Sequence, residues 1–237
     1  MSNIRLFSSE RLSLNLNSKL NKSQSHYINK VMRIKVNEKF SLFNSVGEWE
    51  AKINEISKGL VKFTVIKHLR HKESSKEIWL AFSPIKSNYF NFMIQKSTEL
   101  GITKFFPIIF DRTIVRKVNK QRLEKVIIES AEQSNRINIP LIEKPQSLKS
   151  FLSNNKNKIN LIFTDLNSKN KKIELNKSTN KPVCIIIGPE GDFSEKERQL
   201  IIEKKEIFSL SLANNLLRAE TAAIAAVTIV NYHLNFN

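Results

Sequence analysis

The fold is decided by residues 183–197, which read VCIIIGPEGDFSEKE. The apolar run Val183–Ile187 has the length and composition of a buried strand. A Gly-Pro-Glu-Gly loop follows it, and Ser194 with Glu197 has the spacing of a capping box, which opens a helix. Because the chain holds only five glycines, two in this loop indicate backbone that a side chain would obstruct. A strand, a tight loop and a helix start together favour a small-ligand site at the end of the strand.

A second stretch has the same plan. Residues 210–222, which read LSLANNLLRAETA, follow a predicted strand at 207–212 and open a final helix at 219–234. That helix is apolar on nearly all sides from residue 222 to residue 230, so we expect it to be buried in the core or against a partner subunit. Taken alone, the glycine loop is equally consistent with a simple tight turn, and this second stretch with a core helix that has a charged first turn.

The rest of the chain divides into two patterns. Short strands at 40–43, 49–53 and 61–65, joined by glycine turns, predict a small β-barrel, with a short helix at 25–32 before them. From residue 76 onward strands alternate with helices, which predicts a mainly parallel sheet covered by helices. The predicted strands are 78–82, 105–110, 159–163, 183–187 and 207–212, and the predicted helices 91–100, 121–134, 148–152, 195–205 and 219–234.

Charge and composition point to a polyanionic partner. The net charge is +17, which favours RNA, DNA or an anionic membrane, although lysine-rich proteome usage would give the same excess. Residues 1–75 hold 14 basic and 6 acidic residues, so the N-terminal part is the more basic per residue. No apolar run is long enough to span a bilayer, and Cys184 alone permits no internal disulfide, so we expect a soluble cytoplasmic protein. The four histidines form no metal-ligand pattern, and no metal is expected.

Several motifs occur together in one order along the chain. Residues 94–101 read IQKSTELG and residues 131–136 read AEQSNR, between shorter motifs at 5–7 and 26–33 and the two loop stretches at 187–191 and 217–222. In these segments the chain resembles the bacterial small-subunit rRNA uridine-N3 methyltransferases (RsmE type) of the SPOUT superfamily. The two loop stretches are patterns of the superfamily, whereas 94–101 and 131–136 point to this family. The resemblance covers nearly the whole chain.

The resemblance implies a fold and an activity. It implies an α/β protein with an RNA-binding, PUA-like β-barrel at residues 1–73 and a mainly parallel SPOUT methyltransferase domain with a deep trefoil knot at residues 74–237. It implies S-adenosylmethionine as methyl donor and a homodimer with the active site near its interface. The implied reaction is methylation of N3 of a uridine in 16S rRNA, in the decoding region near the 3′ end, within the 30S subunit.

The same resemblance assigns site residues. Arg218 would stabilise negative charge on a uracil oxygen or a phosphate, and Glu220 would either act as the base or orient Arg218. The implied RNA contacts are Arg5, Lys30, Arg33, Lys96 and Arg136. The implied cofactor-binding residues are Ile187, Gly188, Pro189, Glu190, Gly191, Leu210, Ser211, Leu212, Leu216 and Leu217.

The chain departs from the family pattern at three positions. Asp192 and Ala213 replace usual glycines, and Asn215 replaces a usual arginine. The first two are small changes in a site lined by backbone, whereas the third removes one possible RNA or cofactor contact. We expect activity to survive with weaker substrate affinity. Two alternatives stay open: a SPOUT methyltransferase acting on another RNA atom, such as a ribose 2′-oxygen, and a non-catalytic RNA-binding protein of the same fold.

Overall fold

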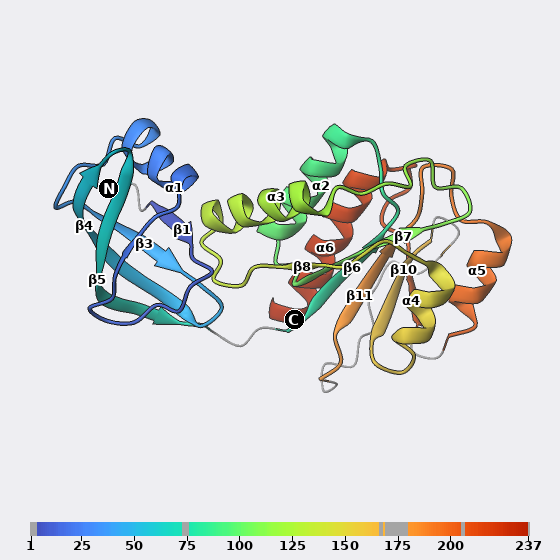
Figure 1. The fold of residues 1–237 in the computed structure, drawn as a ribbon. Coiled ribbons are helices and arrows are strands. Elements are labelled where there is room, and N and C mark those ends of the chain that lie inside the picture. Colours follow the sequence, from blue (N-terminus) through green and yellow to red (C-terminus); the bar gives the residue numbers. More distant parts are fainter. Residues whose placement is uncertain (1–3, 73–75, 166–167, 169–179, 205–206, 237) are drawn as a thin grey trace. The chain divides into compact units, whose positions relative to one another are not determined.

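The chain forms two compact units, each of which is discontinuous in sequence. The computed structural model describes residues 4–72, 76–165, 168, 180–204 and 207–236 (Figure 1). The first unit comprises residues 1–74 and 131–139, and the second comprises residues 75–130 and 140–237. The segment 131–139, which begins in the last turn of helix α3 (Lys120–Gln133), therefore packs with the N-terminal residues.

The N-terminal unit contains a five-stranded mixed sheet in the order β1-β3-β4-β5-β2. Its strands are β1 (Arg5–Phe7), β2 (Asn17–Lys19), β3 (Lys39–Phe43), β4 (Gly47–Ser57) and β5 (Leu60–His71). The three strands expected from alternation lie within β3, β4 and β5. The helix expected at 25–32 is instead α1 (Lys22–His26) followed by a π-helical turn, Tyr27–Val31. The sequence did not reveal β1 and β2, because three residues are too few for an alternating pattern to be recognised.

A buried ionic network crosses this sheet. Arg5 on β1 is 6% exposed, and its Nε donates to Oε1 of Glu48 on β4 at 2.8 Å. Glu48 is 3% exposed and also accepts a hydrogen bond from Arg70 Nε on β5 at 2.8 Å. Burial by itself raises the pKa of Glu48, but the hydrogen bonds and charges of Arg5 and Arg70 outweigh it, so the pKa lies below its ordinary value of 4.5.

The same arginine binds the carboxyl end of α3 and the residues just after it. Arg5 Nη1 donates to the carbonyl oxygens of Ala131 and Glu132, each at 3.1 Å, and Nη2 donates to the carbonyl oxygen of Arg136 at 2.9 Å. The carboxylate of Glu132 in turn accepts the backbone N–H of Phe7 at 2.9 Å. Carbonyls at a helix end have no partner within the helix, so one guanidinium satisfies several of them at once.

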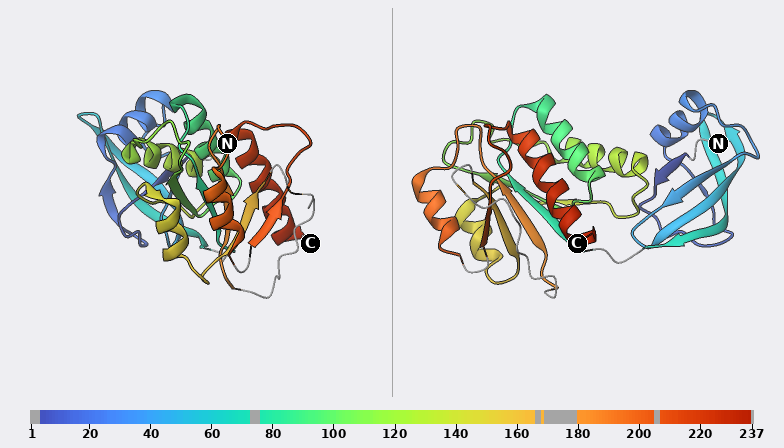
Figure 2. Two further views of the ribbon diagram at one scale, coloured as in Figure 1. Left: turned by 90° about the vertical axis from the view of Figure 1, so that its right-hand side faces the viewer. Right: turned by 180° about the vertical axis from the view of Figure 1, so that it is seen from behind.

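The second unit contains an all-parallel sheet, as the alternation of strands and helices predicted. The strand order is β12-β10-β11-β6-β7-β8, with β9 pairing β7. Figures 1 and 2 show α2 (Ser87–Glu99) and α6 (Ala219–Phe236) on one face and α4 (Leu148–Asn154) and α5 (Glu195–Ile202) on the other. The strands are β6 (Ile78–Phe82), β7 (Lys104–Ile109), β8 (Leu141–Ile142), β9 (Gln146–Ser147), β10 (Asn160–Thr164), β11 (Val183–Ile187) and β12 (Ile207–Leu210). The trefoil knot implied by the resemblance stays a prediction.

The local signals around β11 are confirmed. All five residues of this strand are buried, and it lies between β10 and β6 in the sheet. Ser194 and Glu197 form the expected capping box at the start of α5. The buried Glu197 carboxylate also accepts the backbone N–H of Asp111 at 2.8 Å, which fixes the loop after β7 to the start of α5.

Replacing Glu48 with glutamine should make the free energy of unfolding depend less on pH in the acid range. Because the folded-state pKa of Glu48 is depressed, its contribution to stability is complete above pH 4.5 and is lost as the pH falls below that value. At pH 7 Glu48→Gln should lower the free energy of unfolding by about 3 kcal/mol, since Arg5 loses its buried partner. Urea unfolding of both proteins between about pH 3 and about pH 7 measures this difference.

The matched control is Glu55→Gln, which removes an exposed partner of Lys62 on the same sheet and should change stability little. A deficit of Glu48→Gln that stays constant over the whole pH range would contradict the prediction.

Candidate active site

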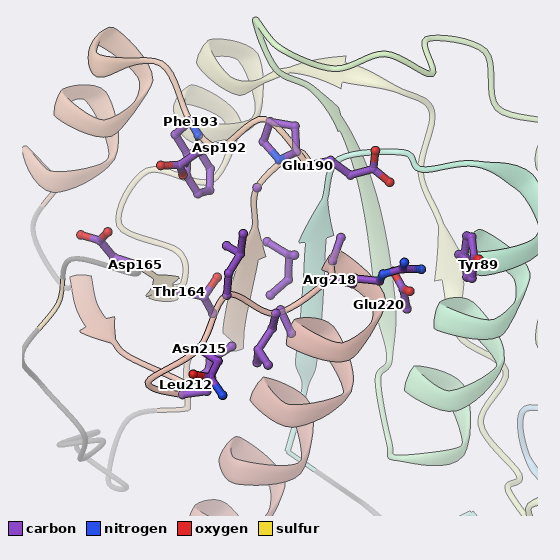
Figure 3. Close-up of a pocket in the computed structure, with 18 of the residues that line it drawn as sticks. Tyr89, Thr164, Asp165, Glu190, Asp192, Phe193, Leu212, Asn215, Arg218 and Glu220 are labelled. Atoms are coloured by element: carbon purple, nitrogen blue, oxygen red, sulfur yellow. Dashed lines mark hydrogen bonds between the residues drawn. The ribbon is translucent and has the colours of Figure 1, made fainter.

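A pocket of about 530 Å³ opens at the carboxyl ends of β10, β11 and β12, beside the start of α6 (Figure 3). Carboxyl ends of parallel strands meet at one edge of a sheet, and ligands bind in the crevice outside them. The volume is within the range of small-molecule and cofactor sites. The pocket is lined by Lys86, Tyr89, Thr164, Asp165, Ile187, Gly188, Pro189, Glu190, Asp192, Phe193, Leu210, Leu212, Ala213, Asn215, Leu216, Leu217, Arg218, Ala219, Glu220 and Ala222.

The glycine loop is shaped by an aromatic ring. A Cβ atom built at Gly188 would lie 2.6 Å from Cε2 of Phe193, so the ring occupies the space that a side chain would need. Phe193 is 5% exposed and packs edge-on against Phe110 and Phe163, with ring centroids 5.2 and 5.0 Å away. Gly191 is different, because a Cβ there would meet only Arg112 at 3.6 Å. Only the first glycine is therefore required by close packing.

The loop between β12 and α6 presents open backbone to the pocket. Leu212, Leu216 and Leu217 line it, and within the described part of the chain their N–H and C=O groups make no hydrogen bond. Open backbone groups flanked by apolar side chains suit a flat, heteroatom-rich ligand that is recognised by the main chain.

Arg218 and Glu220 lie at one side of this pocket (Figure 3). The Arg218 side chain is exposed, and its Cζ lies 5.5 Å from the centroid of the Tyr89 ring. Glu220 is 8% exposed in the first turn of α6, where a carboxylate interacts favourably with the helix dipole. An exposed cation and a buried carboxylate thus line the same cavity.

The opposite side of the pocket is acidic. Figure 3 shows Asp165 and Asp192 there, and both pair with Arg198 of α5. Burial lowers the pKa of Arg198, but the hydrogen bond to Asp165 and the charges of both aspartates outweigh it, so the pKa is raised above its ordinary value. Arg198 therefore remains a cation.

The pocket brings together most of the expected cofactor-binding residues and both expected catalytic ones. Gly191 and Ser211 do not line it. The sequence reasoning missed Lys86, Tyr89 and the pair Thr164-Asp165. The pair could have been found, because it directly follows predicted strand 159–163 and strand ends meet at one edge. Lys86 and Tyr89 carry no such signal, since only the folded chain brings α2 to the cavity.

The expected RNA contacts differ in their surroundings. Arg5 is a correction: its guanidinium is buried and donates to Glu48 and to backbone carbonyls, so it is not available to RNA. Arg136 is partly buried, and burial lowers its pKa to about 10. Lys30 and Arg33 are exposed on the N-terminal unit, whereas Lys96 is half-buried and paired with Glu99 at 2.9 Å.

The described residues contain neither a metal-binding cluster nor a membrane-spanning helix. No group of three or more His, Cys, Asp or Glu side chains in that part of the chain could hold a metal ion. Helices long and apolar enough to cross a membrane do not occur among the same residues.

Comparison with known proteins identifies the family. An RNA methyltransferase domain model matches residues 72–231, and an RNA methyltransferase PUA domain model matches residues 20–66. Ribosomal RNA small subunit methyltransferase E from Rickettsia conorii is 37% identical over 207 residues, which cover 86% of this chain and 85% of the relative. The chain belongs to the methyltransferase E family. The Buchnera aphidicola member from Schizaphis graminum is 32% identical over 94% of both chains.

Two solved structures share the whole architecture. Methyltransferase E from Neisseria gonorrhoeae, crystallised with S-adenosylmethionine, superposes with a TM-score of 0.90 at 26% identity and covers 99% of this chain and 100% of its own. A Legionella pneumophila methyltransferase in complex with the same cofactor gives a TM-score of 0.86 at 28% identity over 98% of both chains. The expected PUA-like and parallel-sheet domains are thus confirmed as those of the methyltransferase E family.

The structure accounts for two departures from the family pattern. Asp192 has φ +63°, a conformation that favours glycine but that aspartate tolerates better than most residues. Its carboxylate accepts the N–H of Phe193 at 2.8 Å and pairs with Arg198 at 3.0 Å. Ala213 has no positive φ, so its backbone does not require glycine. Asn215 lines the pocket and is exposed, and nothing in the structure replaces the arginine that is usual there.

The pocket residues fit S-adenosylmethionine. Four carboxylates line the cavity, those of Asp165, Glu190, Asp192 and Glu220, against the cations of Lys86 and Arg218. An excess of negative charge favours a ligand that carries a sulfonium cation. The open backbone of the β12–α6 loop can pair with the polar edge of an adenine, and its leucines can cover the faces of the ring.

Gly188→Ala should destabilise the methyltransferase unit, whereas Gly191→Ala should not. The added methyl group at residue 188 overlaps the buried Phe193 ring, which should lower the free energy of unfolding by about 1–3 kcal/mol. The same change at residue 191 meets only an ordinary van der Waals contact. Urea unfolding of the two variants tests this comparison, and equal stability of both variants would contradict the packing argument.

Proposed function

We propose that the protein transfers a methyl group from S-adenosylmethionine to N3 of a uridine in 16S rRNA, in the decoding region near the 3′ end. The observation that carries the proposal is the meeting of the glycine loop and the β12–α6 loop in one pocket, with Arg218 and Glu220 beside it. Family membership supports the reaction class, and the bound cofactor of the Neisseria gonorrhoeae structure supports the methyl donor. The uridine N3 target rests on the resemblance in segments 94–101 and 131–136.

In this proposal the two loops bind and orient the cofactor. S-adenosylmethionine supplies an activated methyl group together with its own leaving group, so the chemistry requires no metal ion. Residues 187–190, at the end of β11, form one wall, and Leu212, Leu216 and Leu217 form the other with their open backbone groups. Holding the donor rigidly against the uracil ring provides the alignment that a direct methyl transfer needs.

Arg218 and Glu220 carry the proton and charge chemistry of the proposal. A uracil N3–H must lose its proton before N3 can accept a methyl group, and negative charge then develops on the flanking carbonyl oxygens. Arg218, exposed and long enough to follow the base, stabilises that charge or a neighbouring phosphate. Glu220 accepts the proton or orients Arg218. The target base must be unstacked, because a paired N3 cannot be reached.

The basic surface binds the RNA backbone in this scheme. Lys30 and Arg33 are exposed on the N-terminal unit, and Lys96 lies on α2 of the methyltransferase unit. The net charge of +17 supports association with a polyanion of ribosomal size. Such a substrate implies that the protein works in the cytoplasm.

We also propose that the protein is a homodimer through the face formed by α2 and α6. Phe92 of α2 and Ile229 and Tyr232 of α6 are 46, 37 and 58% exposed, so these two packed helices present apolar side chains to solvent. Tyr232→Glu should convert the dimer to a monomer in sedimentation equilibrium, because a buried charge at the interface is costly. Leu200→Glu, which alters an exposed residue of α5 on the other face of the sheet, is the matched control and should leave the dimer intact. A wild-type monomer would contradict this part of the proposal.

The test of function is a methyl-transfer assay. Purified protein and labelled S-adenosylmethionine are incubated with 30S subunits that lack native uridine-N3 methylation, and nucleosides are analysed by mass spectrometry. We expect 3-methyluridine in the decoding-region RNA. Label in a ribose 2′-O-methyl nucleoside would keep the enzyme class and overturn the target atom. Absence of both label and cofactor binding would favour a non-catalytic RNA-binding protein.

Variants at the two proposed catalytic residues make the assay specific. Arg218→Ala should lower turnover by about 100-fold or more, since it removes the cation that stabilises developing charge. Glu220→Gln keeps the shape and the hydrogen-bonding capacity of the side chain but cannot accept a proton. A loss of about 100-fold or more in Glu220→Gln assigns the base, whereas a loss only in Glu220→Ala assigns the orienting role. Near-normal turnover of both Arg218→Ala and Glu220→Ala would refute the scheme.

A further inference from the structure

One cation bridges the separate segments that form the pocket wall. Arg198 lies in α5, and its side chain is 11% exposed. Its Nη1 donates to Oδ1 of Asp165, and its Nη2 donates to Oδ2 of Asp192 at 3.0 Å. The guanidinium also lies over the Phe163 ring, with Cζ 5.7 Å from the centroid. Neither the two catalytic residues nor the family segments include this arginine.

The two carboxylates belong to different parts of the pocket. Asp165 directly follows β10, and its backbone N–H donates to the carbonyl oxygen of Leu210 at the end of β12 at 3.2 Å. Asp192 closes the glycine loop that follows β11, in its positive-φ conformation. Both aspartates line the cavity, whereas Arg198 is not among the residues that line it. The arginine thus connects the ends of three neighbouring strands from outside the ligand space.

The two carboxylates lie on one side of the cavity and share Arg198 as a cationic partner. Asp165 is 9% exposed, and the charge of a buried carboxylate is stabilised by a paired cation such as Arg198. Without Arg198, the Asp165 carboxylate would share one side of an acidic cavity with that of Asp192, and repulsion between like charges would favour a wider separation of the two aspartates. A loop displacement of about 1 Å is enough to weaken a preorganised site.

We propose that Arg198 is a positioning residue of the cofactor pocket, which by bridging Asp165 and Asp192 fixes the spacing of the ends of β10 and β11 and thereby sets the affinity for S-adenosylmethionine. The inference rests on the proposed function, because it presumes that this cofactor occupies the pocket. It also gives Asp192 a role: the residue that replaces a usual glycine of the family supplies one of the two acceptors of the bridge.

The experiment measures cofactor binding to the full-length protein by isothermal titration calorimetry. Arg198→Met should raise the Kd for S-adenosylmethionine by about 10-fold or more. Arg198→Lys should raise it by less, because an ammonium keeps the positive charge although it lacks the planar fork that reaches both acceptors. In steady-state assays the KM for the cofactor should rise while kcat and the KM for the ribosomal subunit change little, as expected when ground-state binding is lost.

Lys104→Met is the matched control. Lys104 lies in the same unit, pairs with Glu143 at 2.8 Å and sits over the rings of Trp79 and Phe106, but it is not among the residues that line the pocket. It should lose stability without changing the Kd for the cofactor. Asp192→Asn, which keeps the size of the side chain and tolerance of positive φ, provides a second variant should Arg198→Met fail to fold, and it should also raise the Kd.

The outcomes separate the two proposals. A wild-type protein that does not bind S-adenosylmethionine overturns the proposed function, and this inference with it. A wild-type protein that binds, together with Arg198→Met, Arg198→Lys and Asp192→Asn that bind equally well, overturns the positioning role alone. An effect of Lys104→Met on the Kd as large as that of Arg198→Met would also overturn it, because the change would then reflect general destabilisation.

Discussion

The pocket depends on the contact between the Phe193 ring and the bare Cα of Gly188. The ring turns the glycine loop back over the end of β11 and anchors it to Phe110 and Phe163, which come from other parts of the sheet edge. Because aromatic rings in a core are packed without free volume, the loop has one position and not a range of positions. The glycine loop lines the cavity, so this fit defines one of its walls.

The net charge of the whole chain and the charge of the cavity lining have opposite signs. The chain as a whole is strongly basic, which suits a nucleic-acid substrate, yet the cavity is lined by more carboxylates than cations. A uniformly basic protein would repel a cationic methyl donor from its own active site, so a local reversal of sign is needed. Arg198 pairs with two of these carboxylates, Asp165 and Asp192, and so neutralises part of the acidic wall without lining the cavity itself.

Short-range patterns predicted more of this protein than long-range ones. The capping box at Ser194 and the strand at 183–187 followed from spacing and composition, because each depends on residues close in sequence. The parallel sheet followed from the alternation of strands with helices, which is also a pattern of local signals. The fate of Arg5 did not, since its partner Glu48 is 43 residues away and its carbonyl acceptors lie beyond residue 130. A basic residue near the N-terminus suggested RNA binding, but the fold uses it as an internal tie. The pairing of Asp192 with Arg198 was also not predicted, although they are only six residues apart, because Asp192 precedes α5 and the spacing matches no helical i,i+3 or i,i+4 pair.

The discontinuity of the N-terminal unit limits how the protein can have been assembled and how it can be taken apart. Residues 131–139 belong to that unit while the chain on both sides of them belongs to the other, so the polypeptide passes from one unit to the other three times. No single cut yields two whole domains. A fragment beginning after residue 74 would leave the carbonyls at the end of α3 without the Arg5 guanidinium, and an isolated N-terminal fragment would leave Arg5 and its ionic network without those acceptors. An intact N-terminal unit therefore requires residues 131–139, and a module exchange between relatives would have to carry this segment with the N-terminal residues.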